Sequence, residues 1–227
     1  MKTDWIIRQG NTELLLFFSG WGMDRALADH LALSLPHNPV FDLLACHDYR
    51  TAEIDAGTRD AMRSYKRLTV VAWSFGVWAA AHTPLPPVTH AVALNGTLAP
   101  VDRFAGIAPD LFKATLDTYG DDARRRFNRR MCGGGEALDH FLSLELRRSS
   151  ECQKEELAAF AARLDAPGCP ESFRYDHVII GGKDLVFSPS CQFAAWRGYA
   201  QTVIADMPHY PFFHLESLQE VLECSRG

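Results

Sequence analysis

The stretch around Ser74 restricts the fold of this chain more than any other. Residues 70–80 read Val-Val-Ala-Trp-Ser-Phe-Gly-Val-Trp-Ala-Ala: an apolar β-branched run, a serine, and an alanine-rich segment with helical character. Ala72 and Gly76 flank the serine, and small residues are needed there when a strand turns sharply into a helix. The pattern predicts a nucleophile elbow, with Ala72 in place of the more common first glycine. An ordinary strand-to-helix turn is the alternative.

Composition favours one α/β domain, although two small domains also suit a chain of 227 residues. Hydrophobic residues make up 47% and charged residues 22%, as in ordinary soluble proteins. We expect no membrane span and no secretory signal, because no apolar run is long enough. The six cysteines are scattered without a Cys-x-x-Cys pair, so we expect neither disulfides nor a metal site, and a cytoplasmic location. The net charge of −5 gives no reason to expect nucleic acid.

Strands alternate with helices along most of the chain, which is typical of a largely parallel sheet with helices on both faces. We expect strands at residues 13–18, 40–44, 68–73, 89–94, 177–180 and 201–204. Outside the interval described next, we expect helices from about residue 25, around 190–199 and from 212 to the C-terminus.

Residues 97–165 differ, because they contain no convincing strand. They show helical patterns at 110–119, 121–131, 137–148 and 152–164, with three glycines at 133–135. This interval is longer than a simple crossover needs. We therefore expect a helical cap, inserted after the strand that ends near Leu94, over the strand ends where ligands bind in such sheets.

Two further residues supply what a serine nucleophile needs, which is a base oriented by a carboxylate. Asp184 follows a β-branched run and two glycines, and His209 follows the last expected strand, between Pro208 and Pro211. The chain order Ser, Asp, His is that of the α/β-hydrolases, so the sequence predicts this fold.

Both assignments have alternatives. Asp184 would also serve as a helix cap before residue 190 or as a surface turn residue. His214 competes with His209, but we expect it in the following helix, where it would pack or be solvated. Either histidine is also compatible with a plain surface or core position.

A second oxyanion donor is needed for acyl transfer. Ser19-Gly20-Trp21-Gly22 follows an early strand, where an α/β-hydrolase places that donor. We assign the role to the backbone N–H of Trp21, paired with that of Phe75, and expect the Trp21 indole to line the pocket. A glycine turn beside a core tryptophan is the alternative.

Taken together, these motifs resemble the BioG family of pimeloyl-[acyl-carrier-protein] methyl ester esterases. The residues that carry the resemblance are Phe-Ser-Gly-Trp-Gly-Met-Asp at 18–24, Ala-Trp-Ser-Phe-Gly at 72–76, Asn-Gly-Thr at 95–97, Phe-Asn-Arg-Arg-Met-Cys at 127–132 and His-Tyr-Pro-Phe at 209–212. The resemblance extends over most of the chain, from about Leu14 to Leu222.

The resemblance implies an enzyme of biotin synthesis that removes the methyl group from pimeloyl-acyl carrier protein. The roles that carry over are Ser74 as nucleophile, Asp184 as orienting acid and His209 as base, with Trp21 and Phe75 at the oxyanion. No metal or organic cofactor is implied, because water is the second substrate. Another short-chain esterase, a thioesterase and a catalytically silent binding module remain alternatives, since a fold and a triad do not set the substrate.

Basic residues gather in the expected cap. They are Arg124, Arg125, Arg126, Arg129 and Arg130, followed by Arg147 and Arg148. Acyl carrier proteins are acidic, so we expect the first five to bind the carrier. A solvated helix face balanced by nearby acids is the alternative for any single arginine. We expect the protein to be a monomer.

Overall fold

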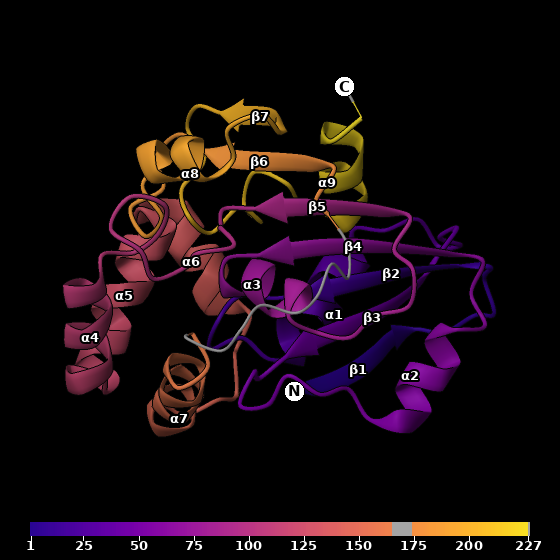
Figure 1. Cartoon of the computed structure of the whole chain (residues 1–227), viewed down its shortest axis with the longest axis horizontal. Coiled ribbons are helices and arrows are strands. Elements are labelled where there is room, and N and C mark those ends of the chain that lie inside the picture. Colours follow the sequence, from indigo (N-terminus) through magenta and orange to yellow (C-terminus); the bar gives the residue numbers. More distant parts are fainter. Residues whose placement is uncertain (165–173, 227) are drawn as a thin grey trace.

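In the computed structural model, which describes residues 1–164 and 174–226, the apolar runs of the sequence form one sheet (Figure 1). Its seven strands are β1 (Lys2–Ile7), β2 (Glu13–Phe18), β3 (Asp42–His47), β4 (Arg67–Trp73), β5 (His90–Leu94), β6 (His177–Gly181) and β7 (Ala200–Ile204). The spatial order is β1-β3-β2-β4-β5-β6-β7. Among the described strands, β1 alone runs antiparallel to its neighbour, so the carboxyl ends of the other strands meet at one edge.

Helices cover both faces of this sheet. They are α1 (Arg25–Leu33), α2 (Ala56–Met62), α3 (Phe75–Ala81), α4 (Pro109–Thr118), α5 (Asp121–Cys132), α6 (Gly135–Ser143), α7 (Ser150–Ala161), α8 (Pro189–Ala195) and α9 (Leu218–Cys224). Helix α3 lies on the near face in Figure 1, and α1 and α9 lie on the far face. The middle strands are buried on both sides, which explains why β2 and β4 are almost continuous apolar runs.

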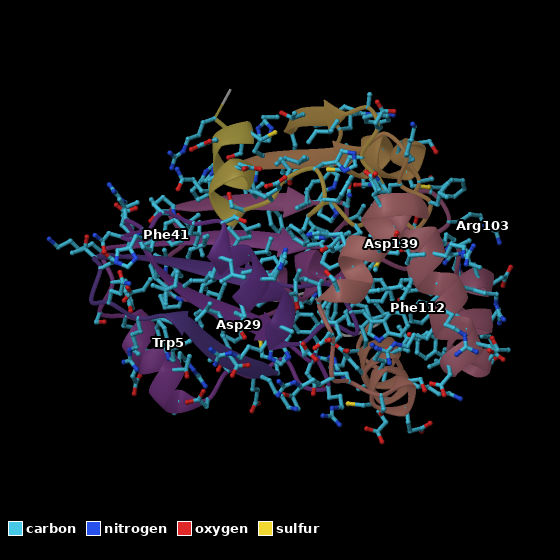
Figure 2. All side chains as sticks on the ribbon, turned by 180° about the vertical axis from the view of Figure 1, so that it is seen from behind. Trp5, Asp29, Phe41, Arg103, Phe112 and Asp139 are labelled. Carbon is cyan, nitrogen blue, oxygen red and sulfur yellow. The ribbon has the colours of Figure 1, made fainter. Side chains whose placement is uncertain are left out.

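Among the described residues between β5 and β6 there are four helices, α4 to α7, which are called the inserted helices below. They gather beyond the arrowheads of β4 and β5 in Figure 1. In Figure 2, Phe112 and Asp139 lie in this region, at the opposite end of the molecule from Trp5 and Phe41. The position of the inserted helices is therefore at the edge where α/β folds bind ligands. The expected end of this segment, Asp165, lies outside the described residues.

Several element boundaries differ from the sequence-based expectation. The third strand begins at Asp42 and not at residue 40, because the Asp42 carboxylate accepts backbone N–H groups of Gln9 and Gly10 at 2.9 and 3.2 Å. Helix α6 ends at Ser143 and not at residue 148, since Glu145 takes a positive φ of 51°.

The C-terminal helix is also shorter than expected. Ser217 caps it, with its side chain accepting the N–H of Glu220, so α9 begins at Leu218 and not at residue 212. His214 consequently lies in an exposed turn, and its expected helical position was wrong. The sequence patterns of β1 and α2 were not recognised: β1 is a partly exposed edge strand, and α2 is only two turns long.

Within the described residues, no helix is both long and apolar enough to cross a membrane.

The turn from β4 to α3 packs directly against the ends of two other strands. A Cβ built on Gly76 would lie 2.3 Å from the carbonyl oxygen of Phe18 and 2.6 Å from that of Ser19. A Cβ on Gly96 would lie 2.4 Å from the carbonyl oxygen of Ser74. Both contacts are with backbone, which has little freedom to move, so glycine is required at these two positions.

Gly76→Ala should therefore destabilise the protein, by roughly 1–3 kcal/mol, because the new methyl group forces the main chain of the β2 loop away from the elbow. Urea unfolding measures this change in the free energy of unfolding. The matched control is Gly57→Ala in α2, where an added Cβ meets only Asp55 Oδ1, at 3.4 Å. The control should raise stability by about 0.5–1 kcal/mol. Equal effects of the two substitutions would contradict this packing argument.

Candidate active site

Ser74 occupies a strained backbone conformation between β4 and α3. Its φ is 59° and its ψ is −127°, a region that a residue with a side chain rarely adopts and that costs ~1–3 kcal/mol. The Ser74 N–H donates to the carbonyl of Leu94 at 3.0 Å, and its own carbonyl accepts the N–H of Val77 at 3.1 Å. These bonds and the surrounding glycines hold the sharp turn, as the elbow pattern predicted. An ordinary strand-to-helix turn does not describe this geometry.

The structure brings Ser74, His209 and Asp184 into one hydrogen-bonded series. His209 Nε2 lies 2.9 Å from Ser74 Oγ, and His209 Nδ1 lies 2.9 Å from Asp184 Oδ2. All three side chains are buried. A histidine placed between a hydroxyl and a carboxylate can take a proton at Nε2 while the carboxylate fixes its orientation. His214 takes no part in the series, because it lies in the exposed turn described above.

Both carboxylate oxygens of Asp184 accept hydrogen bonds. Oδ1 accepts the N–H groups of Val186 and Phe187 at 2.7 and 2.8 Å, and Oδ2 accepts the amide of Gln192 at 3.0 Å. The cap of α8 is Ser188, whose hydroxyl accepts the N–H of Cys191. Asp184 is therefore neither the helix cap nor a surface residue, and its orientation toward His209 is fixed by its own loop.

Two side chains position the loop that carries His209. Asn95 donates to the carbonyls of Pro208 and His209 at 2.9 and 3.0 Å, and its side-chain oxygen accepts the N–H of Gly181 at 2.7 Å. The indole of Trp73 donates to the His209 carbonyl at 2.9 Å. Sequence reasoning gave Asn95 no role. Its position, a polar residue directly after a buried strand, was the signal that could have revealed one.

The backbone N–H groups of Phe75 and Trp21 are the two candidate oxyanion donors. Both residues line the cavity that contains Ser74 and His209. Among the described residues, neither N–H has a hydrogen-bond acceptor. A Cβ on Gly20 would lie 3.0 Å from the Trp73 ring, so this loop passes close to the elbow. The Trp21 indole donates to the carbonyl of Gln153 at 2.7 Å and packs against the rings of Tyr119 and Phe127.

A buried ion pair connects the Trp21 loop to the inserted helices. Glu156 on α7 accepts Arg148 Nη1 at 2.6 Å, the N–H of Gly22 at 3.0 Å and the N–H of Tyr49 at 2.8 Å. Burial raises the pKa of Glu156, and the charge of Arg148 opposes that rise. Gln153 adds a bond of 2.9 Å to the Gly22 carbonyl. The loop that carries the Trp21 N–H is thus fixed by α7.

The arginines of the expected basic cluster lie in different environments in the structure. Arg148 is buried against Glu156 and so is not part of an exposed patch. The guanidinium of Arg124 donates to the carbonyl of Arg148 at 2.8 Å, and Arg125 pairs with Asp122. Arg126 and Arg129 are exposed and form no ion pair with any described residue.

Arg130 differs from the other four arginines because it lines the cavity with Ser74 and His209. Its guanidinium lies 5.8 Å from the centre of the Phe127 ring. Nε is buried and has no hydrogen-bond partner among the described residues. This burial lowers the pKa of Arg130, and Asp184 acts in the opposite direction. Otherwise the cavity wall is largely apolar, with Ile107, Phe112, Met131 and Leu157 among its residues.

Comparisons with known proteins match the chain to one family model and to two relatives. A family model described as "Pimeloyl-ACP methyl esterase BioG" matches residues 1–221. The chain is 39% identical over 204 residues to a malonyl-[acyl-carrier protein] O-methyltransferase of Bacteroides fragilis, covering 87% of this chain and 39% of the relative. It thus spans about two fifths of that relative's length. An uncharacterized protein of Haemophilus influenzae is 30% identical over 213 residues, which cover 93% of this chain and 94% of that protein.

Solved structures confirm the predicted α/β-hydrolase fold. The crystal structure of BioG from Haemophilus influenzae superposes with a TM-score of 0.85 at 29% identity, covering 96% of this chain and 98% of the other. An esterase from Exiguobacterium antarcticum superposes with a TM-score of 0.65 at 14% identity, covering 99% and 92%, and shows the shared fold alone.

Removing one partner of the Arg148–Glu156 pair should be costly, because the other charge stays buried. We expect Arg148→Met to lower the free energy of unfolding by about 3–5 kcal/mol. The double variant Arg148→Met/Glu156→Gln should recover part of that loss, because it removes the unpaired charge and keeps an acceptor for the backbone N–H groups of Gly22 and Tyr49. Denaturant unfolding of the two variants checks both values. A double variant as unstable as the sum of the single changes would show that the pair is not the interaction that matters.

Proposed function

Because the chain belongs to the BioG family of pimeloyl-ACP methyl esterases, we propose that it hydrolyses the methyl ester of pimeloyl-acyl carrier protein to the free acid and methanol, a step of biotin synthesis. The observation that carries the chemistry is the series Ser74–His209–Asp184, with both contacts at 2.9 Å. The cytoplasmic location and the monomeric state expected from the sequence remain predictions.

In the first half of the reaction, Ser74 is acylated. His209 Nε2 takes the proton of Ser74 Oγ as that oxygen attacks the ester carbonyl, and Asp184 stabilises the imidazolium that forms. The backbone N–H groups of Phe75 and Trp21 donate to the oxyanion, a contribution worth about 3 kcal/mol for each donor. When the tetrahedral intermediate collapses, the C–O bond to the methoxy group breaks and His209 protonates the departing oxygen. Methanol leaves, and the pimeloyl chain stays attached to both Ser74 and the carrier.

The second half of the reaction uses water as the nucleophile. His209 takes a proton from water, the hydroxyl attacks the Ser74 ester, and the same two N–H groups stabilise the second oxyanion. Ser74 leaves with the proton returned by His209. The product carries a free carboxylate at the end of the chain that was the methyl ester.

We propose that the inserted helices act as the cap over this site and that the arginines on α5 bind the carrier. The cavity receives Phe112, Phe127 and Leu157 from these helices, which exclude water from an apolar acyl chain. Arg126 and Arg129 are the exposed members without an acidic partner among the described residues, so they are free to attract an acidic protein. The carrier as substrate is a proposal that rests on family membership and on this charge distribution.

Ser74→Ala and His209→Ala should each lower kcat for methanol release from pimeloyl-carrier-protein methyl ester, by about 10³-fold or more, because each removes a member of a unit that acts together. His214→Ala, at the competing histidine, is the matched control and should retain wild-type activity. Labelling by a fluorophosphonate probe should disappear in Ser74→Ala. A wild-type protein that neither labels nor releases methanol would favour the silent binding module, whereas labelling without methanol release would leave another esterase or a thioesterase.

Arg129→Glu should raise KM for the carrier-bound ester and reduce the salt dependence of kcat/KM, because the change removes a charge that attracts the acidic carrier. A short methyl ester should be hydrolysed as by the wild type. Arg63→Glu, at the exposed residue that caps the C-terminus of α2 and pairs with Asp60, is the control and should change neither value; α2 lies at the opposite end of the molecule from α5 (Figure 1). Steady-state kinetics from low to high salt test this. Equal losses on both substrates would refute a role in carrier binding.

A further inference from the structure

Two histidines outside the triad contact the residue that follows His209. This residue, Tyr210, is buried, and its hydroxyl lies 3.1 Å from His140 Nδ1 on α6. His140 Nε2 in turn lies 3.0 Å from His30 Nε2 on α1. Tyr210, His140 and His30 therefore form a second hydrogen-bonded series, which connects α6 and α1 to the loop that carries the base.

The burial of Tyr210 determines where the protons of this series lie. Burial raises the pKa of Tyr210, so its hydroxyl keeps its proton, and a buried proton needs an acceptor. Among the described residues, the partner of this hydroxyl is His140 Nδ1, which must therefore be unprotonated. A neutral His140 then carries its proton on Nε2 and donates it to His30 Nε2, and the proton of His30 lies on Nδ1.

This order of donors and acceptors has no place for an added proton. A proton on His30 Nε2 reverses the series, because His140 then accepts at Nε2 and donates from Nδ1 to the Tyr210 oxygen. The Tyr210 proton is left without an acceptor. A second proton places N–H groups of both imidazoles opposite each other and breaks the contact of 3.0 Å. Each added proton thus weakens the hydrogen bond that holds Tyr210.

The surrounding groups favour the neutral histidine pair near neutral pH. Burial lowers the pKa of His140, the charge of a protonated His30 lowers it further, and Glu216 in the turn before α9 opposes both effects. On α5, burial raises the pKa of the Cys132 thiol beside Tyr210 to about 12, so that thiol stays neutral. Both histidines are half-buried and accessible to solvent protons. The series is therefore complete above the usual histidine pKa of about 6.5 and is lost as the pH falls through the lowered pKa of His140.

We propose that His140 is a positioning residue for the catalytic base, and that protonation of the His30–His140 pair releases Tyr210 and lowers activity in acid. The Tyr210 N–H donates to the carbonyl of Met131 at 2.9 Å, so the hydroxyl and the N–H hold this residue at two points. Because Tyr210 and His209 share a peptide bond, loss of the hydroxyl contact loosens the orientation of the base. His140 acts through Tyr210 and takes no part in proton transfer. The inference rests on the triad assigned under the proposed function.

The first test divides kcat/KM of the wild type by that of Tyr210→Phe, on a short p-nitrophenyl ester, from about pH 8 to about pH 5. The division cancels the ionisation of His209, which both proteins share. The ratio should be about five at the alkaline end, as expected for the loss of one hydrogen bond, and should fall to about one at the acidic end. A ratio that does not change with pH would overturn the proposal. Far-UV circular dichroism and Tm confirm that the variant is folded.

A conservative replacement separates positioning from mere packing. In His140→Asn, the side-chain oxygen lies near the place of Nδ1 and accepts the Tyr210 proton without titrating. This variant should match the wild type near pH 8 and lose less activity than the wild type toward pH 5. His140→Leu should resemble Tyr210→Phe. His214→Asn, in the exposed turn, is the matched control and should follow the wild type at every pH. Equal losses in His140→Asn and His140→Leu would overturn the positioning role.

Nuclear magnetic resonance of ¹⁵N-labelled histidines tests the order of protons without any assay of activity. At about pH 8, the signal that disappears in His140→Asn should belong to an imidazole protonated on Nε2. An imidazole protonated on Nδ1 would overturn the proposed series. An active esterase whose activity ratio does not change with pH would overturn this inference alone, whereas a wild type that is inactive on every ester would overturn the proposed function as well.

Discussion

The sharp turn at Ser74 is the constraint on which the rest of the site depends. Its backbone is strained, and it persists because the ends of β2 and β5 pack against it with no room for a side chain at Gly76 or Gly96. The same packing brings Leu94 to the Ser74 N–H, and Asn95, the next residue, to the His209 loop. The Ser74 turn, the His209 loop and the Trp21 loop are thus placed by contacts among strand ends, so a displacement of one strand would shift all three.

A second constraint connects the inserted helices to the candidate active site. Glu156 and Gln153 on α7 bind the backbone of Gly22, next to Trp21, and Arg148 completes the ion pair. The inserted helices therefore hold the loop that carries Trp21, the proposed second oxyanion donor.

The site residues that could be predicted from sequence are those that lie in short, recognisable motifs. Ser74 between small residues, Asp184 after a β-branched run and His209 in a proline-restricted loop each follow a strand end, and topology then brings strand ends together. Contacts between residues that are far apart in the sequence have no such local motif. The bond from Asn95 to the His209 carbonyl spans 114 residues, and the pairing of Arg148 with Glu156 depends on how α7 docks on the Trp21 loop. The sequence grouped Arg130 with the exposed Arg126 and Arg129, because sequence does not show that the Arg130 Nε is buried.

The covalent intermediate tests the central claim most directly, because it shows both the nucleophile and the bond that breaks. The measurement is rapid-quench mass spectrometry of the intact protein mixed with pimeloyl-carrier-protein methyl ester. Methyl ester cleavage at Ser74 predicts a transient conjugate of the enzyme with the whole carrier, smaller by one methanol than the sum of the two, and localised to Ser74 after proteolysis. A Ser74 adduct bearing only the pimeloyl methyl ester, with free carrier released, would show thioester cleavage and contradict this account.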